Sequence, residues 1–101
     1  MNISEQIGMP ALLEQCAEEC AELGKAGLKL ARKLRRENPT PMTEKEIVSN
    51  LTEEIADVLL CIEEIVDSGL ISNEAIDSVR IAKSKRWKAR IYENELQKRG
   101  A

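Results

Sequence analysis

Acidic residues recur three positions apart in two separate segments of this 101-residue chain, which contains no histidine. One pair is Glu19 and Glu22, and the other is Glu54 and Asp57. Residues three apart lie on the same side of an α-helix, so each pair would present two carboxylates to one neighbour. Oxygen ligands without histidine suit a hard cation, and the spacing therefore indicates a site for Mg²⁺ or Mn²⁺.

The angular positions of the two pairs support this interpretation. At about 100° per residue, Glu19 lies about 70° and Glu54 about 80° from the apolar stripe of its own helical segment. Glu22 and Asp57 lie farther round, at about 130° and about 140°. If the two segments pack as neighbours, four carboxylates converge in one cleft and repel one another unless a cation bridges them. Solvated surface charge is the alternative, because such pairs also arise by chance in an acidic chain.

Cationic side chains near the C-terminal end supply the opposite charge. Lys83, Arg86 and Arg90 fall within about 60° of one another on a helix, on the side that carries Val79 and Trp87. Such groups form charge-assisted hydrogen bonds with phosphate oxygens, and carboxylate-bound Mg²⁺ commonly contacts substrate phosphates as well. The combination favours a polyphosphate ligand. The alternative is that the stems of these side chains lie along the core while their charged ends stay in water.

The net charge of −3 conceals a strong segregation of charge along the chain. Residues 1–24 carry five acids and no base, whereas residues 25–37 carry six bases and one acid. Residues 44–77 carry ten acids and one lysine, and residues 83–99 carry seven bases and two acids. Because acidic segments dominate, a surface for duplex nucleic acid is disfavoured, and we expect no nucleic-acid partner.

The cysteines and the apolar runs limit the remaining possibilities. Cys16, Cys20 and Cys61 are too few to form a zinc site without histidine, and we interpret them as small core residues. The longest apolar run, residues 58–62, is too short to span a bilayer. With no secretory signal at the start of the sequence, we expect a cytoplasmic protein without a membrane partner.

The elements that position these residues are predicted to be three long helices, because no segment shows strand-like alternation. The first covers residues 11–36 and follows a proline near its first turn. The second begins after Thr43, whose spacing to Glu46 matches a capping box, and the third begins after Ser72. Two breaks separate them, the two-proline segment 38–43 and the segment 67–73, which contains a glycine suited to a helix end.

Apolar residues step by three or four along each predicted helix, which is typical of a helical bundle. The series are Leu13, Cys16, Cys20, Leu23, Gly27, Leu30 and Leu34; then Ile47, Leu51, Ile55, Val58, Ile62 and Ile65; and last Ile76, Val79, Trp87 and Ile91. Leu60 lies about 180° around the second helix from Leu51, so that helix is apolar on two sides. We therefore predict an all-α bundle of three to four main helices, completed by oligomerisation.

Three short stretches, taken in order, resemble a known family. They are Glu-Glu-Cys-Ala-Glu-Leu at 18–23, Glu-Glu-Ile-Ala-Asp-Val at 53–58 and Lys-Ser-Lys-Arg-Trp at 83–87. They are similar to the Glu-Glu-x-x-Glu … Glu-x-x-Asp signature and the Lys-x-x-Arg-aromatic element of MazG-like nucleotide pyrophosphohydrolases, in the all-α NTP pyrophosphatase superfamily. The resemblance covers about residues 11–92, and it implies that residues 1–101 form one MazG-like domain.

This resemblance implies Mg²⁺-dependent hydrolysis of a nucleoside triphosphate, a (d)NTP, to the monophosphate and pyrophosphate by a homodimer or homotetramer. By position, Glu19, Glu22, Glu54 and Asp57 would be the catalytic metal ligands, and Lys83 and Arg86 would bind the substrate. Three departures from the family pattern leave the preferred base open: thirty-one residues separate Glu22 from Glu54, no asparagine directly precedes Lys83, and the chain has fewer aromatic residues than the relatives that stack the base between them.

Two functions of other classes fit the same residues. One is a non-catalytic helical interaction module in which the acidic and basic faces direct assembly. The other is a nucleotide-binding regulator that holds metal and nucleotide without turnover. Release of pyrophosphate in the presence of Mg²⁺ distinguishes the enzyme from both.

Overall fold

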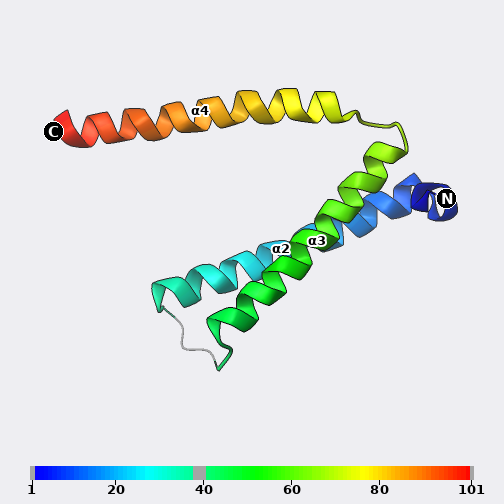
Figure 1. Ribbon diagram of the computed structural model, residues 1–101, viewed down its shortest axis with the longest axis horizontal. Helices are drawn as coiled ribbons and strands as arrows, with labels where there is room; N and C mark the ends of the chain where they lie inside the picture. The colour runs from blue at the N-terminus through cyan, green and yellow to red at the C-terminus, as the bar shows by residue number, and fades with distance from the viewer. Residues whose placement is uncertain (1, 38–40, 101) are drawn as a thin grey trace. The chain divides into compact units, whose positions relative to one another are not determined.

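The computed structural model describes residues 2–37 and 41–100 and consists of four α-helices (Figure 1). Over those residues the chain contains no strand, which confirms the predicted all-α class. The helices are α1 (Ile3–Ile7), α2 (Met9–Arg35), α3 (Glu44–Asp67) and α4 (Asn73–Gly100). No helix within these two ranges is long and apolar enough to cross a membrane.

The predicted helix starts agree with the capping contacts. The backbone N–H of Glu46 donates to Thr43 Oγ1 at 3.1 Å, and that of Ala75 donates to Ser72 Oγ at 3.1 Å. Gly69 follows α3 with a φ of +86°, a left-handed conformation that glycine adopts without steric cost. Residues 38–40 of the predicted proline-containing break lie outside the described residues.

The N-terminal helix α1 was not predicted from the sequence. It is five residues long, and Gly8 separates it from α2 with a φ of +87°. A helix this short contains little more than one turn, so it offers no apolar periodicity to detect. The first long helix, α2, begins at Met9 and ends at Arg35, within two residues of the predicted bounds.

The contacts divide the chain into two units, of which the first ends at Leu70 and the second begins at Ile71. In the first unit α2 and α3 lie side by side, and their packing positions the candidate site (Figure 1). The buried apolar side chains of this unit are Leu12, Ile47, Val58, Cys61 and Ile65. Leu13 and Leu34, which the predicted series placed in the core, are 45% and 60% exposed, and Leu12, the neighbour of Leu13, is buried instead.

Two further residues of the predicted core of α3 are exposed. Ile55 is 42% and Ile62 38% exposed, and together with Val48 and Leu59 they form a second apolar stripe along α3. The predicted series combined this stripe with the neighbouring one that contains Ile47, Val58 and Ile65. Only the latter is buried, because a single helix such as α2 covers one side of α3.

The second unit is α4 with the residues just before it, and none of the side chains of α4 is buried within it. Val79, Trp87 and Ile91, predicted as core residues, are each more than half exposed. A single helix has no second surface within its own unit against which to bury an apolar face.

Candidate functional site

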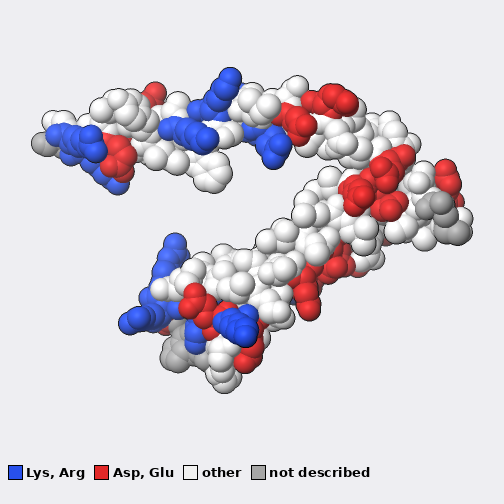
Figure 2. Space-filling model, viewed as in Figure 1, with Lys and Arg blue, Asp and Glu red and all other residues white. Residues whose placement is uncertain are grey.

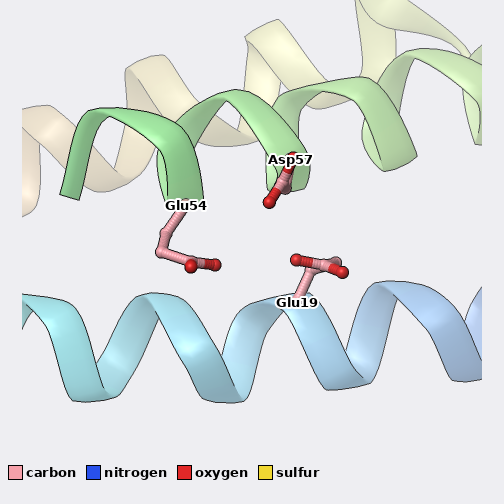
Figure 3. A group of neighbouring side chains, drawn as sticks. All are labelled: Glu19, Glu54 and Asp57. Carbon is pink, nitrogen blue, oxygen red and sulfur yellow. The ribbon is translucent and has the colours of Figure 1, made fainter. Parts of the chain in front are cut away.

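Three of the four carboxylates singled out in the sequence meet in the space between α2 and α3. Glu19 of α2 and Glu54 and Asp57 of α3 each offer one oxygen, and these three oxygens lie within 4.8 Å of one another. Figure 3 shows the Glu19 side chain pointing toward α3, and those of Glu54 and Asp57 pointing toward α2. We call these three residues the carboxylate cluster.

The surroundings of Glu54 disfavour its ionised form. Its Oε2 atom is buried and has no hydrogen-bond partner among the described residues. Desolvation raises the pKa of Glu54 above 4.5, and the negative charges of Asp57, Glu19, Glu22 and Glu53 raise it further, in that order. Because Glu54 Oε2 is buried without a hydrogen-bond donor, a cation bound there would stabilise the ionised carboxylate and oppose the rise in its pKa.

Glu19 is held in place by a neighbour on its own helix. The side-chain amide of Gln15 donates to Glu19 Oε1 at 2.8 Å, one turn earlier on α2. This hydrogen bond restricts the rotamer of Glu19 on the side that faces α3. The cluster therefore has one carboxylate fixed by α2 and two presented by successive turns of α3.

Glu22, the fourth predicted ligand, lies next to the cluster but outside the group of three oxygens. Its Oε1 is 3.6 Å from Lys25 Nζ, in an exposed ion pair on α2. Its charge nevertheless contributes to the raised pKa of Glu54, and both side chains line the same groove.

This groove has a volume of about 330 Å³ and lies between α2 and α3 beside Glu54. Ile47, which is fully buried, and Ala26 contribute its apolar lining, while Lys25, Lys29 and Asn50 contribute polar groups. Neither lysine was predicted from the sequence as a site residue. They follow Glu22 at spacings of three and seven residues, which place them on the same side of α2. This spacing could have identified them from the sequence.

A smaller cavity of about 160 Å³ lies on the other side of the carboxylate cluster and is also lined by Glu19 and Asp57. Its apolar lining comes from α1, through Ile3 and Ile7, and from Leu12 and Leu60. No lysine or arginine of the described residues lines this cavity. The two sides of the cluster therefore differ in charge.

The predicted substrate-binding residues Lys83 and Arg86 belong to α4, in the second unit. They line one side of that helix together with Val79, Trp87 and Arg90, as the angular prediction required. The carboxylate cluster and the groove beside it are formed entirely by residues of the first unit.

The three cysteines are free, and they differ in exposure. Cys61 is buried and Cys16 half-buried, in agreement with a packing role, whereas Cys20 is exposed and was wrongly placed in the core. Burial is the main cause that raises the pKa of the Cys16 and Cys61 thiols.

The donor set of the carboxylate cluster fits a hard divalent cation. It consists of carboxylate oxygens alone, one of them buried without a donor, and Mg²⁺ prefers such ligands together with water and phosphate oxygens. Comparison of the chain with protein-family models, with curated proteins and with solved structures gave no match.

Proposed function

We propose that the chain is a cytoplasmic, Mg²⁺-dependent nucleotide pyrophosphohydrolase that converts a (d)NTP into the (d)NMP and pyrophosphate. The observation that carries the proposal is the meeting of Glu19, Glu54 and Asp57 from two helices, with one Glu54 oxygen buried and unpartnered. The ordered resemblance of residues 18–23, 53–58 and 83–87 to MazG-like enzymes supports it, and on this basis residues 1–101 are proposed to form one such domain.

In this proposal Glu19, Glu54 and Asp57 hold the metal ion, and Glu22 joins them when substrate enters the adjoining groove. Carboxylate-bound Mg²⁺ supplies charge neutralisation and orientation of phosphate groups. The reaction adds water to the α-phosphorus, breaks its bond to the bridging oxygen and releases pyrophosphate.

Lys83 and Arg86 are proposed to bind phosphate oxygens of the substrate. Both side chains are exposed and lie on one side of α4 with the exposed aromatic Trp87. An arginine or lysine on a phosphate stabilises the charge that develops on the departing pyrophosphate.

A homodimer or homotetramer is part of the same proposal. The exposed stripe of Val48, Ile55, Leu59 and Ile62 on α3 supports it, because water-exposed apolar rows of this length are typical of surfaces that become covered. Sedimentation equilibrium of the purified chain tests the assembly, and a mass equal to that of the 11.3 kDa monomer at all concentrations would contradict it.

The test of the enzymatic proposal is pyrophosphate release from a panel of (d)NTPs with Mg²⁺, repeated with a chelator. We expect release from at least one nucleotide, loss of release with the chelator, and loss in Glu54→Gln. Glu63→Gln is the matched control, because Glu63 is an exposed acid of α3 outside the carboxylate cluster. Release of orthophosphate, or no release from any nucleotide, would contradict the proposal.

A non-catalytic interaction module is the second candidate, and one observation favours it. Large apolar side chains of α4 are exposed, among them Trp87 at 64% and Tyr92 at 65%. If the chain binds neither Mg²⁺ nor nucleotide, this candidate replaces the first. Binding of both without turnover would instead identify a nucleotide-binding regulator.

A further inference from the structure

We propose that Lys25 and Lys29 of α2 form a binding site for the phosphate groups of the substrate that lie beyond the metal ion. The site is the groove between α2 and α3 that adjoins Glu54, which we call the lysine groove. This inference rests on the proposed function, because it assigns the direction in which a triphosphate leaves the carboxylate cluster. It concerns residues that neither the acidic pairs nor the family resemblance singled out.

The lysine groove is continuous with the carboxylate cluster. Glu54 lines the lysine groove and is also a member of the carboxylate cluster. A ligand bound at the cluster can therefore extend directly into the groove. Lys25 and Lys29 lie three and seven residues beyond Glu22, about 4.5 Å and about 10 Å farther along the helix axis. Three phosphates joined by bridging oxygens extend over a comparable distance.

The two sides of the carboxylate cluster differ in charge. The cavity on the opposite side, toward α1, is lined by Ile3, Ile7, Leu12 and Leu60, and no cationic residue of the described chain lines it. In Figure 2 the Lys and Arg side chains visible on the first unit gather at the end where α2 finishes and α3 begins. A polyanion anchored at the cluster is therefore attracted toward the lysine groove.

Both lysines have contacts that a phosphate would readily replace. Lys29 Nζ donates to the thioether sulfur of Met42 at 3.6 Å, and such a sulfur is a weak acceptor. Lys25 forms an exposed ion pair with Glu22 at 3.6 Å, which contributes little in water. Metal binding by Glu22 would free Lys25 for the phosphate. The volume of about 330 Å³ is sufficient for phosphate groups with their water.

The experiment uses inorganic tripolyphosphate, so that binding is measured without turnover of a nucleotide. Its affinity for the full chain is measured by isothermal titration calorimetry with excess Mg²⁺, for wild type, Lys25→Gln, Lys29→Gln and Lys29→Arg. Lys45→Gln is the matched control, because Lys45 is an exposed lysine of α3 outside the groove. In parallel, the shift of the melting temperature by Mg²⁺ alone is measured for each protein.

We expect Lys25→Gln and Lys29→Gln each to raise the Kd of tripolyphosphate by about tenfold or more, the effect of losing one charge-assisted contact. Lys29→Arg keeps most of the affinity, and Lys45→Gln leaves it within about twofold of wild type. The stabilisation by Mg²⁺ alone persists in every variant, because the carboxylates that bind the ion are unchanged. A Kd that rises equally in Lys45→Gln would indicate general attraction by surface charge and would overturn the inference.

The outcomes separate this inference from the proposed function. Mg²⁺ stabilising the wild type would support the metal site. If wild type and all variants then bind tripolyphosphate equally, or if no protein binds it, the lysine groove is wrong and the metal site remains. If Mg²⁺ does not stabilise the wild type while Lys29→Gln still loses tripolyphosphate affinity, the metal-dependent function is wrong and the groove is an anion site.

Discussion

Glu19 on α2 and Glu54 on α3 present carboxylate oxygens within 4.8 Å of each other, although thirty-five positions separate them in the sequence. Two like charges this close oppose the packing of the helices that carry them. The packing persists because Ile47, Val58, Cys61 and Ile65 of α3 are buried in the same unit. The cluster therefore lies where folding free energy holds mutually repelling groups together, as is typical of functional sites.

The first prediction concerns Mg²⁺ and stability. Wild type should gain RT ln(1 + [Mg²⁺]/Kd) in the free energy of unfolding, about 1.4–2.7 kcal/mol when Mg²⁺ is at 10–100 times Kd. Glu54→Gln should gain much less, since it removes a ligand while keeping the side-chain volume. Thermal unfolding with chelator and with millimolar Mg²⁺ measures both. The control Glu63→Gln should respond as wild type does, and equal shifts in all three proteins would identify the cluster as ordinary surface charge.

The second prediction concerns pH in the absence of metal. The pKa of Glu54 is raised in the folded chain, so the folded state binds this proton more tightly than the unfolded state does. The pKa of Glu54 is near 4.5 in the unfolded state and higher in the folded state. As pH rises from the first pKa to the second, the contribution of this proton to the free energy of unfolding declines. With chelator present, urea unfolding from about pH 4.5 to about pH 7.5 should show wild type losing stability relative to Glu54→Gln.

Mg²⁺ should counteract this loss of stability with rising pH in the wild type. Metal and proton compete for the same Glu54 carboxylate, so binding of Mg²⁺ strengthens as pH rises through the folded pKa. The stabilisation by Mg²⁺ should therefore be larger at the upper end of that range than at the lower end. A stabilisation that is independent of pH would place the ion away from Glu54.

The third prediction tests the cationic side of α4. Lys83→Ala or Arg86→Ala should weaken binding of a (d)NTP by about 1.5–3 kcal/mol, roughly tenfold to a hundredfold in Kd, because each removes a charge-assisted contact with phosphate. The helical content measured by circular dichroism should not change, since both side chains are exposed. Arg99→Ala, near the end of α4, serves as the control, and equal effects of all three substitutions would contradict the assigned phosphate role.

The fourth prediction concerns the core that supports the site. Ile47 has no exposed surface, so Ile47→Ala should lower the free energy of unfolding by about 2–5 kcal/mol through lost burial and a residual cavity. Leu28→Ala, at a position that is 59% exposed on α2, should change it by about 0.5 kcal/mol or less. Chemical denaturation of the two variants at one protein concentration provides the comparison. Similar losses in both would mean that the α2–α3 interface differs from the one described.

Features that depend on residues close together in the chain could be predicted from the amino-acid order alone. Thr43 and Ser72 cap α3 and α4 because a hydroxyl reaches a backbone N–H three residues later, whatever the rest of the chain does. The spacing of Glu54 and Asp57 likewise places both carboxylates on one side of α3, and periodicity predicted that this side borders the core. These local relationships hold before any helix meets another.

Tertiary structure decided what periodicity leaves open. An apolar stripe fixes the direction of a helix face only within a broad sector, so the choice of Leu12 over Leu13, and the exposure of Ile55 and Ile62, followed from where α2 contacts α3. The lysine groove depends on the same packing: Lys25 and Lys29 of α2 line one groove with Glu54 and the buried Ile47 of α3. Contacts between residues far apart in sequence depend on that packing, and no spacing within one helix encodes it.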